Sequence, residues 1–121
     1  MPSKKTLVLG ASSNPEQYSN IAIVRLRSHG HPVEAIGKTA FQIKDVYVET
    51  EKIDFPDIHT VTLYLNPTRQ NEYVEYIFSL NPTRIIFNPG AENENLKKLA
   101  ENQSIEAINA CTLVLLSTGA Y

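Results

Sequence analysis

Cysteine is almost absent from this sequence, because Cys111 is the only one among 121 residues. A single thiol excludes a disulfide within the chain, and no other cysteine or histidine stands at metal-ligand spacing from it, so the sequence indicates no zinc site. Free cysteines usually pack as small core residues, which favours a buried structural thiol at this position. A reactive thiol is the alternative.

Long apolar runs and blocks of like charge are also lacking. No stretch approaches the roughly 20 apolar residues that span a bilayer, and residues 1–5 lead straight into an expected strand rather than into the apolar core of a signal peptide. We therefore expect a cytosolic protein with no membrane partner. The 11 basic and 13 acidic residues are spread along the chain, which argues against nucleic acid as a partner and leaves any phosphate site local.

Short apolar runs recur along the chain with helical segments between them. Runs typical of buried strands lie at 6–9, 32–36, 59–65, 84–87 and 104–108, and a short edge strand is an open alternative at 46–48. Helical spacing predicts helices ending near Gly30, near Leu80 and near Asn102. Ser19 or Asn20 is the expected N-cap of the first helix, and Asn66 of the second. The apolar tail at 111–116 fits a short helix covering the sheet, with a strand as the alternative.

The alternation of strands and helices predicts the fold class. Crossover helices between apolar strands require a mainly parallel sheet with right-handed connections. A length of 121 residues, 42% of them hydrophobic, fits one domain rather than two. We predict a single Rossmann-like, doubly wound α/β domain over residues 1–121, with a five-stranded, mainly parallel sheet and helices on both faces.

Small and turn-forming residues follow the predicted strands. In an open parallel sheet ligands bind beyond the carboxyl ends of the strands, so the segments 10–14, 37–38, 66–68 and 88–90 are expected to meet at one edge. The first of them runs into a helix start, where free N–H groups and the helix dipole favour an anion such as a diphosphate. Ser12 and Pro15 stand where a dinucleotide fingerprint needs glycines, and no P-loop sequence is present. An ordinary strand-to-helix turn is the alternative.

Lys38 stands at the end of the second predicted strand. NAD-binding domains usually place an acidic residue there to accept the ribose hydroxyl, whereas a cation suits a phosphorylated ribose. NAD is therefore disfavoured as the cofactor. NADP and coenzyme A both carry such a phosphate, so Lys38 does not choose between them, and a solvated surface lysine is a further alternative.

The order and spacing of these segments resemble a known family, the small stand-alone CoA-binding proteins whose fold is similar to the CoA-binding domain of the succinyl-CoA synthetase α subunit. The resemblance covers nearly the whole chain. It rests on residues 8–12 with Pro15, on 18–20, 30–33, Lys38, 66–67, 88–90 and 109–111. In the synthetase the catalytic phosphohistidine lies in a second domain, so the resemblance implies no ligase activity.

The resemblance also implies a set of site residues. Gly10, Ala11, Ser12 and Ser13 would approach the phosphates, and Lys38 would contact a phosphate of coenzyme A. Tyr64, Leu65, Asn66 and Pro67 would flank the adenine or the pantetheine, while Asn88, Pro89 and Gly90 would line the far side. Tyr18 and Ser19 at the start of the first helix complete the predicted cofactor-binding site. Coenzyme A is the expected cofactor and NADP the less favoured one.

No catalytic set can be assembled from the sequence. His29, His31 and His59 fall at the amino-terminal end of the predicted sheet, and Ser12 and Ser13 lack a histidine partner. Glu92 and Glu94 fit helix capping better than catalysis. We expect a carrier, sensor or regulatory module for coenzyme A or an acyl-CoA; a small enzyme using NADP or a CoA ester is the alternative. Self-association through the apolar tail, or an unknown protein partner, is a further possibility.

Overall fold

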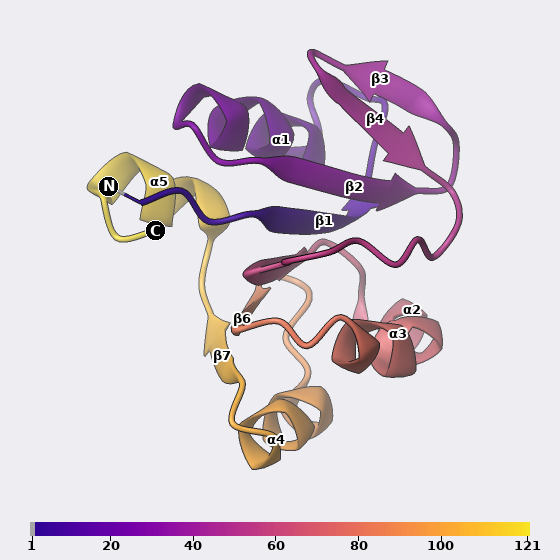
Figure 1. Ribbon diagram of the computed structural model, residues 1–121, viewed down its shortest axis with the longest axis vertical. Coiled ribbons are helices and arrows are strands. Elements are labelled where there is room, and N and C mark those ends of the chain that lie inside the picture. The colour runs from indigo at the N-terminus through magenta and orange to yellow at the C-terminus, as the bar shows by residue number, and fades with distance from the viewer. Residues whose placement is uncertain (1) are drawn as a thin grey trace.

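A seven-stranded sheet runs through the centre of the molecule (Figure 1), and the computed structural model describes it within residues 2–121. Residue 1, part of the expected domain, lies outside the described residues. The strands are β1 (Thr6–Ala11), β2 (Val33–Gly37), β3 (Phe41–Ile43), β4 (Val46–Glu49), β5 (Thr60–Leu63), β6 (Arg84–Phe87) and β7 (Glu106–Asn109). Their spatial order is β3-β4-β2-β1-β5-β6-β7, and every neighbouring pair is parallel except β3 with β4. The Rossmann-like α/β class predicted from the sequence is confirmed.

The sheet has two strands more than the five predicted. One of them, β4, is the strand that the sequence left open at 46–48, but it lies inside the sheet and not at its edge. The passage after β2 forms a hairpin, in which β4 pairs with β2 and β3 takes the edge. Lys44 adopts a left-handed backbone in the tight turn, with φ of 53°, and Asp45 beside it receives two hydrogen bonds from Arg27, at 2.9 and 2.6 Å. A tertiary ion pair thus holds a turn that lacks the usual glycine or asparagine, and the local sequence carries little sign of it.

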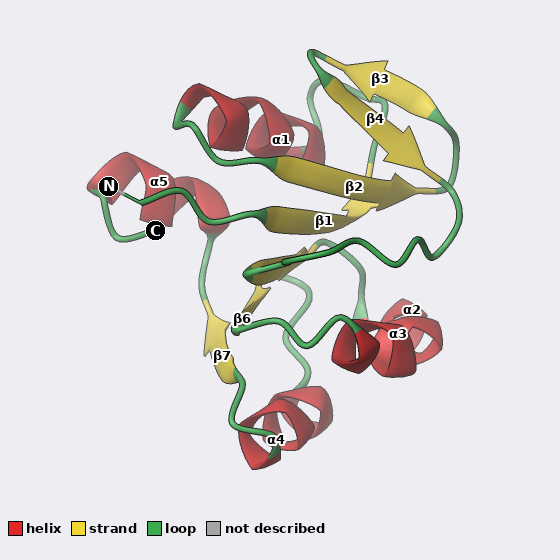
Figure 2. Ribbon diagram, viewed as in Figure 1, coloured by secondary structure: helices red, strands yellow, loops and turns green. Residues whose placement is uncertain are grey.

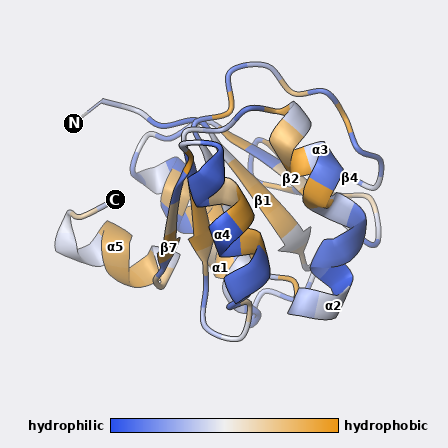
Figure 3. Ribbon diagram, turned by 90° about the horizontal axis from the view of Figure 1, so that it is seen from below, coloured by the Kyte–Doolittle hydropathy of each residue, from blue (hydrophilic) through white to orange (hydrophobic). Residues whose placement is uncertain are grey.

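Helices cover both faces of the sheet (Figure 2). One face packs against α1 (Tyr18–Ser28) and α5 (Thr112–Thr118), through Ile23, Leu26 and Leu116. The other face packs against α3 (Val74–Ser79) and α4 (Glu94–Asn102), through Ile77, Leu80 and Leu96. Strand β1 is largely apolar while the short α2 (Pro67–Gln70) is mostly hydrophilic (Figure 3). This difference is expected, because a central strand is buried on both faces and a surface helix is exposed to solvent.

The predicted N-cap of the first helix is wrong. Helix α1 begins at Tyr18 and its N-cap residue is Gln17, which makes no capping side-chain bond. Ser19 and Asn20 lie in the first turn instead, where both are buried and both bond to the loop in front of the helix. The Ser19 hydroxyl accepts the N–H of Ser12 at 3.1 Å, and the Asn20 amide donates to the carbonyl of Ser12 at 2.8 Å. These polar side chains therefore shape the loop rather than cap the helix.

The helix expected between residues 66 and 80 is divided into three pieces. Asn66 caps α2 as predicted, its side chain accepting the N–H of Arg69 at 2.9 Å, with Pro67 at the first helical position. A 3-10 turn, η1 (Asn71–Tyr73), then separates α2 from α3. The break turns the chain so that Tyr73 contacts the cavity described below.

The tail forms a short helix, as the sequence predicts. Leu116 of α5 is buried against the sheet, while Val114 is 55% exposed on the outer side. Cys111 is the N-cap residue of this helix and is only partly buried, less than expected for a core thiol. Within residues 2–121 the longest helix, α1, has 11 residues, so no described helix is long and apolar enough to cross a membrane.

Candidate functional site

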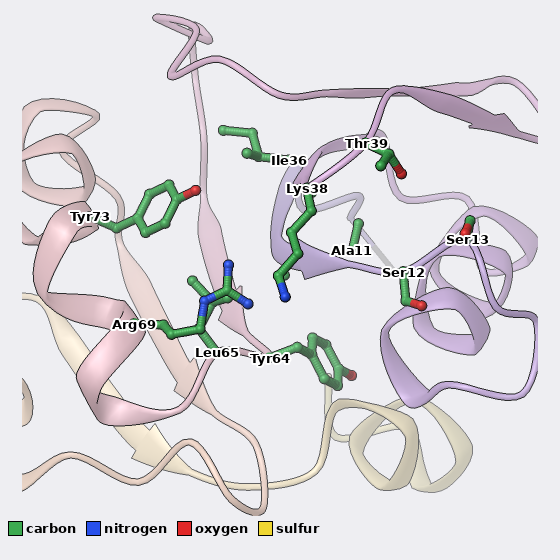
Figure 4. Close-up of a pocket in the computed structure, with 12 residues that line it drawn as sticks. Ala11, Ser12, Ser13, Ile36, Lys38, Thr39, Tyr64, Leu65, Arg69 and Tyr73 are labelled. Atoms are coloured by element: carbon green, nitrogen blue, oxygen red, sulfur yellow. The ribbon is translucent and has the colours of Figure 1, made fainter.

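The main cavity lies where the strand order reverses. From β1 the chain moves outward through β2 and then returns to add β5 on the other side of β1, so the carboxyl ends of these three strands surround one space. The cavity there has a volume of about 370 Å³. The residues that line it (Figure 4) come from the carboxyl ends of β1 and β2, from the segments after β1, β2 and β5, and from α2 and η1. This is the crevice in which doubly wound sheets bind nucleotides.

Backbone approaches that only glycine permits form the floor of this cavity. Gly10 has φ of 92°, and a Cβ there would lie 2.9 Å from the carbonyl oxygen of Tyr64. A Cβ at Gly37 would lie 2.4 Å from the carbonyl oxygen of Ala11. Both contacts are with backbone, which cannot swing aside as a side chain can. The strand ends are therefore closer together here than residues with side chains would allow.

The loop after β1, residues 10–14, is partly occupied by its own hydrogen bonds. The N–H of Ser12 donates to Ser19, and the N–H of Asn14 donates to the Ser12 hydroxyl at 3.1 Å. Among the described residues, the N–H of Ser13 has no acceptor. The loop is thus held in one shape by its side chains and offers an anion fewer free backbone donors than its sequence suggests.

Two cations reach into the cavity without partners. Lys38 follows β2 and Arg69 stands on α2, and in Figure 4 the ammonium and the guanidinium point toward one another. Within residues 2–121, neither side chain makes a hydrogen bond or an ion pair. None of the residues lining the cavity is acidic. The cavity is therefore electropositive, which suits a polyanionic ligand.

Two tyrosines stand at the walls with different roles. The hydroxyl of Tyr73 points toward the cavity in Figure 4, and burial, with the charge of Glu72, raises the pKa of this phenol. The ring of Tyr64 lines the cavity, but its buried hydroxyl points away from Lys38 and has no partner among the described residues. Burial raises the pKa of Tyr64 to about 12. Both phenols are therefore neutral at physiological pH.

A second cavity, of about 340 Å³, adjoins the first. It is lined by residues 64–66 and 89–91, and the two cavities share Tyr64, Leu65 and Arg69. Gln70, which is fully buried, donates to the carbonyl oxygens of Leu65 and Ala91 at 2.8 and 2.7 Å and so ties the two walls together. A long ligand bound beside Arg69 has room to extend from one cavity into the other.

The structure brings together most of the site residues predicted from the sequence, though not all of them. Gly10, Ala11, Ser12, Ser13, Lys38, Tyr64 and Leu65 line the first cavity, while Asn66, Pro89 and Gly90 line the second. Four others line neither: Tyr18 is 70% exposed, Pro67 opens α2, and Ser19 and Asn88 are buried in structural bonds. Asn88 donates to Thr62 and to Leu63, and accepts from the N–H of Thr112.

Sequence reasoning missed several lining residues. They are Ile36, Thr39, Arg69, Tyr73 and Ala91. Gly37, in the predicted segment 37–38, does line the first cavity, and Ile36 and Thr39 flank that segment, so widening it by one residue at each end would have found them. Arg69 lies three residues after the N-cap Asn66, and the first turn of a helix that follows a strand is itself part of the carboxyl edge. Tyr73 carried no such sign, because the 3-10 break that orients it is a tertiary feature.

A comparison with protein families adds the deciding observation, since a family model described as a CoA binding domain matches residues 4–117. The chain belongs to this CoA-binding domain family. The resemblance inferred from the sequence is thereby confirmed. No curated protein matches the chain.

Solved structures share the fold of this chain. A crystal structure described as that of an uncharacterized protein is 40% identical, with a TM-score of 0.96 and full coverage of both chains. A hypothetical protein from Pyrococcus horikoshii OT3 is 25% identical, with a TM-score of 0.85, over 96% of this chain and 83% of its own. An acetyl-coenzyme A synthetase from Ca. Korarchaeum cryptofilum shares the fold at 17% identity, with a TM-score of 0.72, over 88% of this chain and 25% of its own.

Proposed function

We propose that this member of the CoA-binding domain family binds coenzyme A or an acyl-CoA in the two adjoining cavities and acts as a carrier, sensor or regulatory module. The observation that carries the proposal is the electropositive cavity at the point where the strand order reverses. Among residues 2–121, the lining of this crevice has two cations without partners and no acidic residue. An uncompensated positive site of this kind stabilises a ligand with several negative charges.

The shape of the site also fits the two halves of coenzyme A. The first cavity offers cations and a small-residue loop for the nucleotide and its phosphates. The second has Leu65, Pro89 and Ala91 among its lining residues and no acidic side chain, which suits an uncharged arm such as pantetheine. Because Arg69 belongs to both cavities, a ligand spanning them passes its guanidinium. The fit supports a nucleotide with a long, neutral substituent.

The side chains around the first cavity favour binding over chemistry. Its described lining contains serine, threonine, tyrosine, lysine and arginine, but no carboxylate, imidazole or thiol that would serve as a general base or nucleophile at neutral pH. The three histidines, His29, His31 and His59, stand before strands or after α1, away from this edge. We therefore propose recognition of the cofactor, without turnover by this chain alone.

Isothermal titration calorimetry of the purified protein with coenzyme A tests the proposal, with NADP and NAD as competing ligands. We expect coenzyme A to bind more tightly than NADP, and NAD to bind weakest. Replacing Lys38 with alanine should lower the affinity for coenzyme A by about 10-fold or more, since a charge-assisted hydrogen bond contributes about 1.5–3 kcal/mol. Lys98→Ala, at an exposed position on α4, is the matched control. Tighter binding of NADP, or no heat with coenzyme A, would refute the proposed ligand.

A further inference from the structure

Three side chains from three different elements converge on one part of the first cavity. Lys38 follows β2, Arg69 stands on α2, and Tyr73 ends η1. In Figure 4 the ammonium of Lys38 and the guanidinium of Arg69 face each other, and the Tyr73 hydroxyl points toward the same space. Ser12 and Ser13 of the 10–14 loop lie on the other side of Lys38 in this view. The cavity thus has two separate places for an anion.

The two cations carry an electrostatic cost that a ligand can remove. Like charges that face each other across a partly enclosed cavity repel, and within residues 2–121 no carboxylate pairs with either. A dianion between them replaces this repulsion with two attractions. The planar guanidinium of Arg69 can also present two parallel N–H groups to two oxygens of one phosphate, which the ammonium of Lys38 cannot do.

Tyr73 is held in place to serve as a third donor. The ammonium of Lys52 lies 5.1 Å from the centre of the Tyr73 ring and donates to the carbonyl oxygen of Glu72 at 2.5 Å. This cation and the neighbouring Tyr76 ring, at a centroid distance of 6.4 Å, pack against the Tyr73 ring and hold it in place. A phenol is protonated at neutral pH, and burial raises the pKa of Tyr73 further, so its hydroxyl donates a hydrogen bond rather than repelling an anion.

We propose that Lys38, Arg69 and Tyr73 form a clamp for a phosphate monoester, distinct from the 10–14 loop, and that Arg69 is the residue that selects ligands with a phosphorylated ribose. The proposal rests on the proposed function for the identity of the whole ligand. A phosphate monoester has three free oxygens and close to two negative charges at neutral pH, whereas each phosphate of a diphosphate bridge has two free oxygens and one charge. Two opposed cations and a neutral donor match the monoester.

The test is a calorimetric comparison of coenzyme A with dephospho-coenzyme A, which lacks only the monoester. Adenosine 3′,5′-bisphosphate and NADP serve as further monoester ligands. The quantity measured is the factor by which the monoester strengthens binding, in the wild type and in Arg69→Gln, Arg69→Lys and Tyr73→Phe. Arg25→Ala, at an exposed position on α1, is the matched control. Thermal unfolding without ligand checks that each variant is folded.

We expect the monoester to strengthen wild-type binding by about 10- to 100-fold. Arg69→Gln should remove most of that factor. The same variant should change the affinity for dephospho-coenzyme A by less than about threefold. Arg69→Lys should restore only part of the factor, because the paired N–H groups are lost. Tyr73→Phe should lower it by about threefold to tenfold.

Other results overturn one proposal or the other. An equal loss of affinity for both ligands in Arg69→Gln would mean that Arg69 contacts another part of the ligand, and unchanged affinities for both would mean that Arg69 does not contact the ligand; either result overturns the clamp. Equal wild-type affinity for coenzyme A and dephospho-coenzyme A overturns the clamp but leaves coenzyme A as the ligand. Binding of the bisphosphate or NADP that depends on Arg69, without binding of coenzyme A, keeps the clamp and overturns the proposed function. Absence of binding by every ligand overturns both.

Discussion

Cations lie at both ends of the parallel strands, but they are unpaired at one end and hydrogen-bonded at the other. At the carboxyl ends, Lys38 and Arg69 face a cavity and bond to no described residue. At the amino ends, Arg84 is 6% exposed, and it donates to the Thr60 hydroxyl and to the main-chain oxygen of Tyr121, both at 3.0 Å. The carboxyl edge is open and its two cations are unpaired within residues 2–121. The amino edge is sealed by its own side chains, and of the Arg84 guanidinium only Nη2 has no partner among the described residues.

The sealed edge is built around Tyr121. Arg84 lies 4.4 Å from the centre of the Tyr121 ring, His31 packs its ring at a centroid distance of 4.9 Å, and the Tyr121 hydroxyl bonds to Thr6 at 2.5 Å. Lys4 donates from its side chain to the main-chain oxygen of Tyr121. A cation by itself therefore does not mark a ligand site. What marks the carboxyl edge is the lack of protein acceptors around its cations.

The largest expected effect comes from Arg84→Ala. This change removes one hydrogen bond from the Thr60 hydroxyl and one from the main-chain oxygen of Tyr121, which keeps Lys4 as a donor, and it removes the packing on the Tyr121 ring. We expect a loss of about 3 kcal/mol in the free energy of unfolding, measured by urea denaturation. The affinity for coenzyme A at the opposite edge should change little. Arg25→Ala is the exposed control, and equal losses in the two variants would contradict the sealed edge.

The second prediction concerns the floor of the open edge. Gly37→Ala places a Cβ 2.4 Å from the carbonyl oxygen of Ala11, so β1 and β2 must separate. We expect a loss of about 2 kcal/mol in the free energy of unfolding and a parallel loss of coenzyme A binding. Gly30→Ala is the control, because a Cβ there meets nothing within 4 Å and only its φ of 83° is strained. Full coenzyme A affinity in a folded Gly37→Ala protein would show that the close approach is not needed by the ligand.

The sealed edge should also be the acid-sensitive one. His31 Nδ1 accepts the backbone N–H of Lys4 at 2.9 Å, a bond that requires this nitrogen to be unprotonated. Burial lowers the pKa of His31, as do Lys4, His29, Arg84 and His59 nearby. Burial also lowers the pKa of His59, with Arg84 and Lys4, against a smaller opposing effect of Glu106. Protonation of these rings below their unfolded pKa therefore favours the unfolded chain.

The direction of the His31 pKa shift fixes the pH range over which stability is lost. Because the folded pKa of His31 lies below the unfolded value of 6.5, its contribution is fully present above pH 6.5 and is lost as the pH falls from there toward the folded pKa. Each such group contributes at most about 1.4 kcal/mol per pH unit. His31→Asn, whose amide oxygen can still accept the Lys4 N–H, should flatten the urea stability profile between pH 7.5 and 5. His29→Asn is the exposed control, and an unaltered profile in His31→Asn would refute the assignment.

Some parts of this molecule can be predicted from the sequence and others cannot. The strands β1, β2, β5, β6 and β7 and the segments after them follow from apolar runs and turn residues, because strand ends meet at one edge wherever a sheet is parallel. The β3–β4 hairpin does not follow, since the contact of Arg27 with Asp45 replaces a local turn signal. Tyr73 and the sealing of Arg84 by Tyr121 depend on contacts between distant segments, which no local pattern encodes.

The smallest expected effect concerns Tyr64, the residue at the open edge whose polar group faces away from the cavity. Its hydroxyl is buried without a partner among the described residues, and an unmade hydrogen bond of this kind stabilises nothing. Tyr64→Phe should therefore leave the free energy of unfolding unchanged or raise it by up to about 1 kcal/mol, while keeping the ring that lines both cavities. Tyr47→Phe, at a side chain that is 54% exposed, is the control.

The outcome of Tyr64→Phe shows which side chains at the open edge recognise the ligand. If Tyr64→Phe changes neither the stability nor the affinity for coenzyme A, recognition at the open edge depends on Lys38, Arg69 and Tyr73. The ring of Tyr64 then only lines the cavities. A loss of stability above about 1 kcal/mol would mean that its hydroxyl bonds to the nearby Thr62 and Thr112, which already bond to each other at 2.8 Å. A loss of affinity alone would mean that the phenol turns into the cavity when the ligand binds, and the open edge would then have a fourth donor.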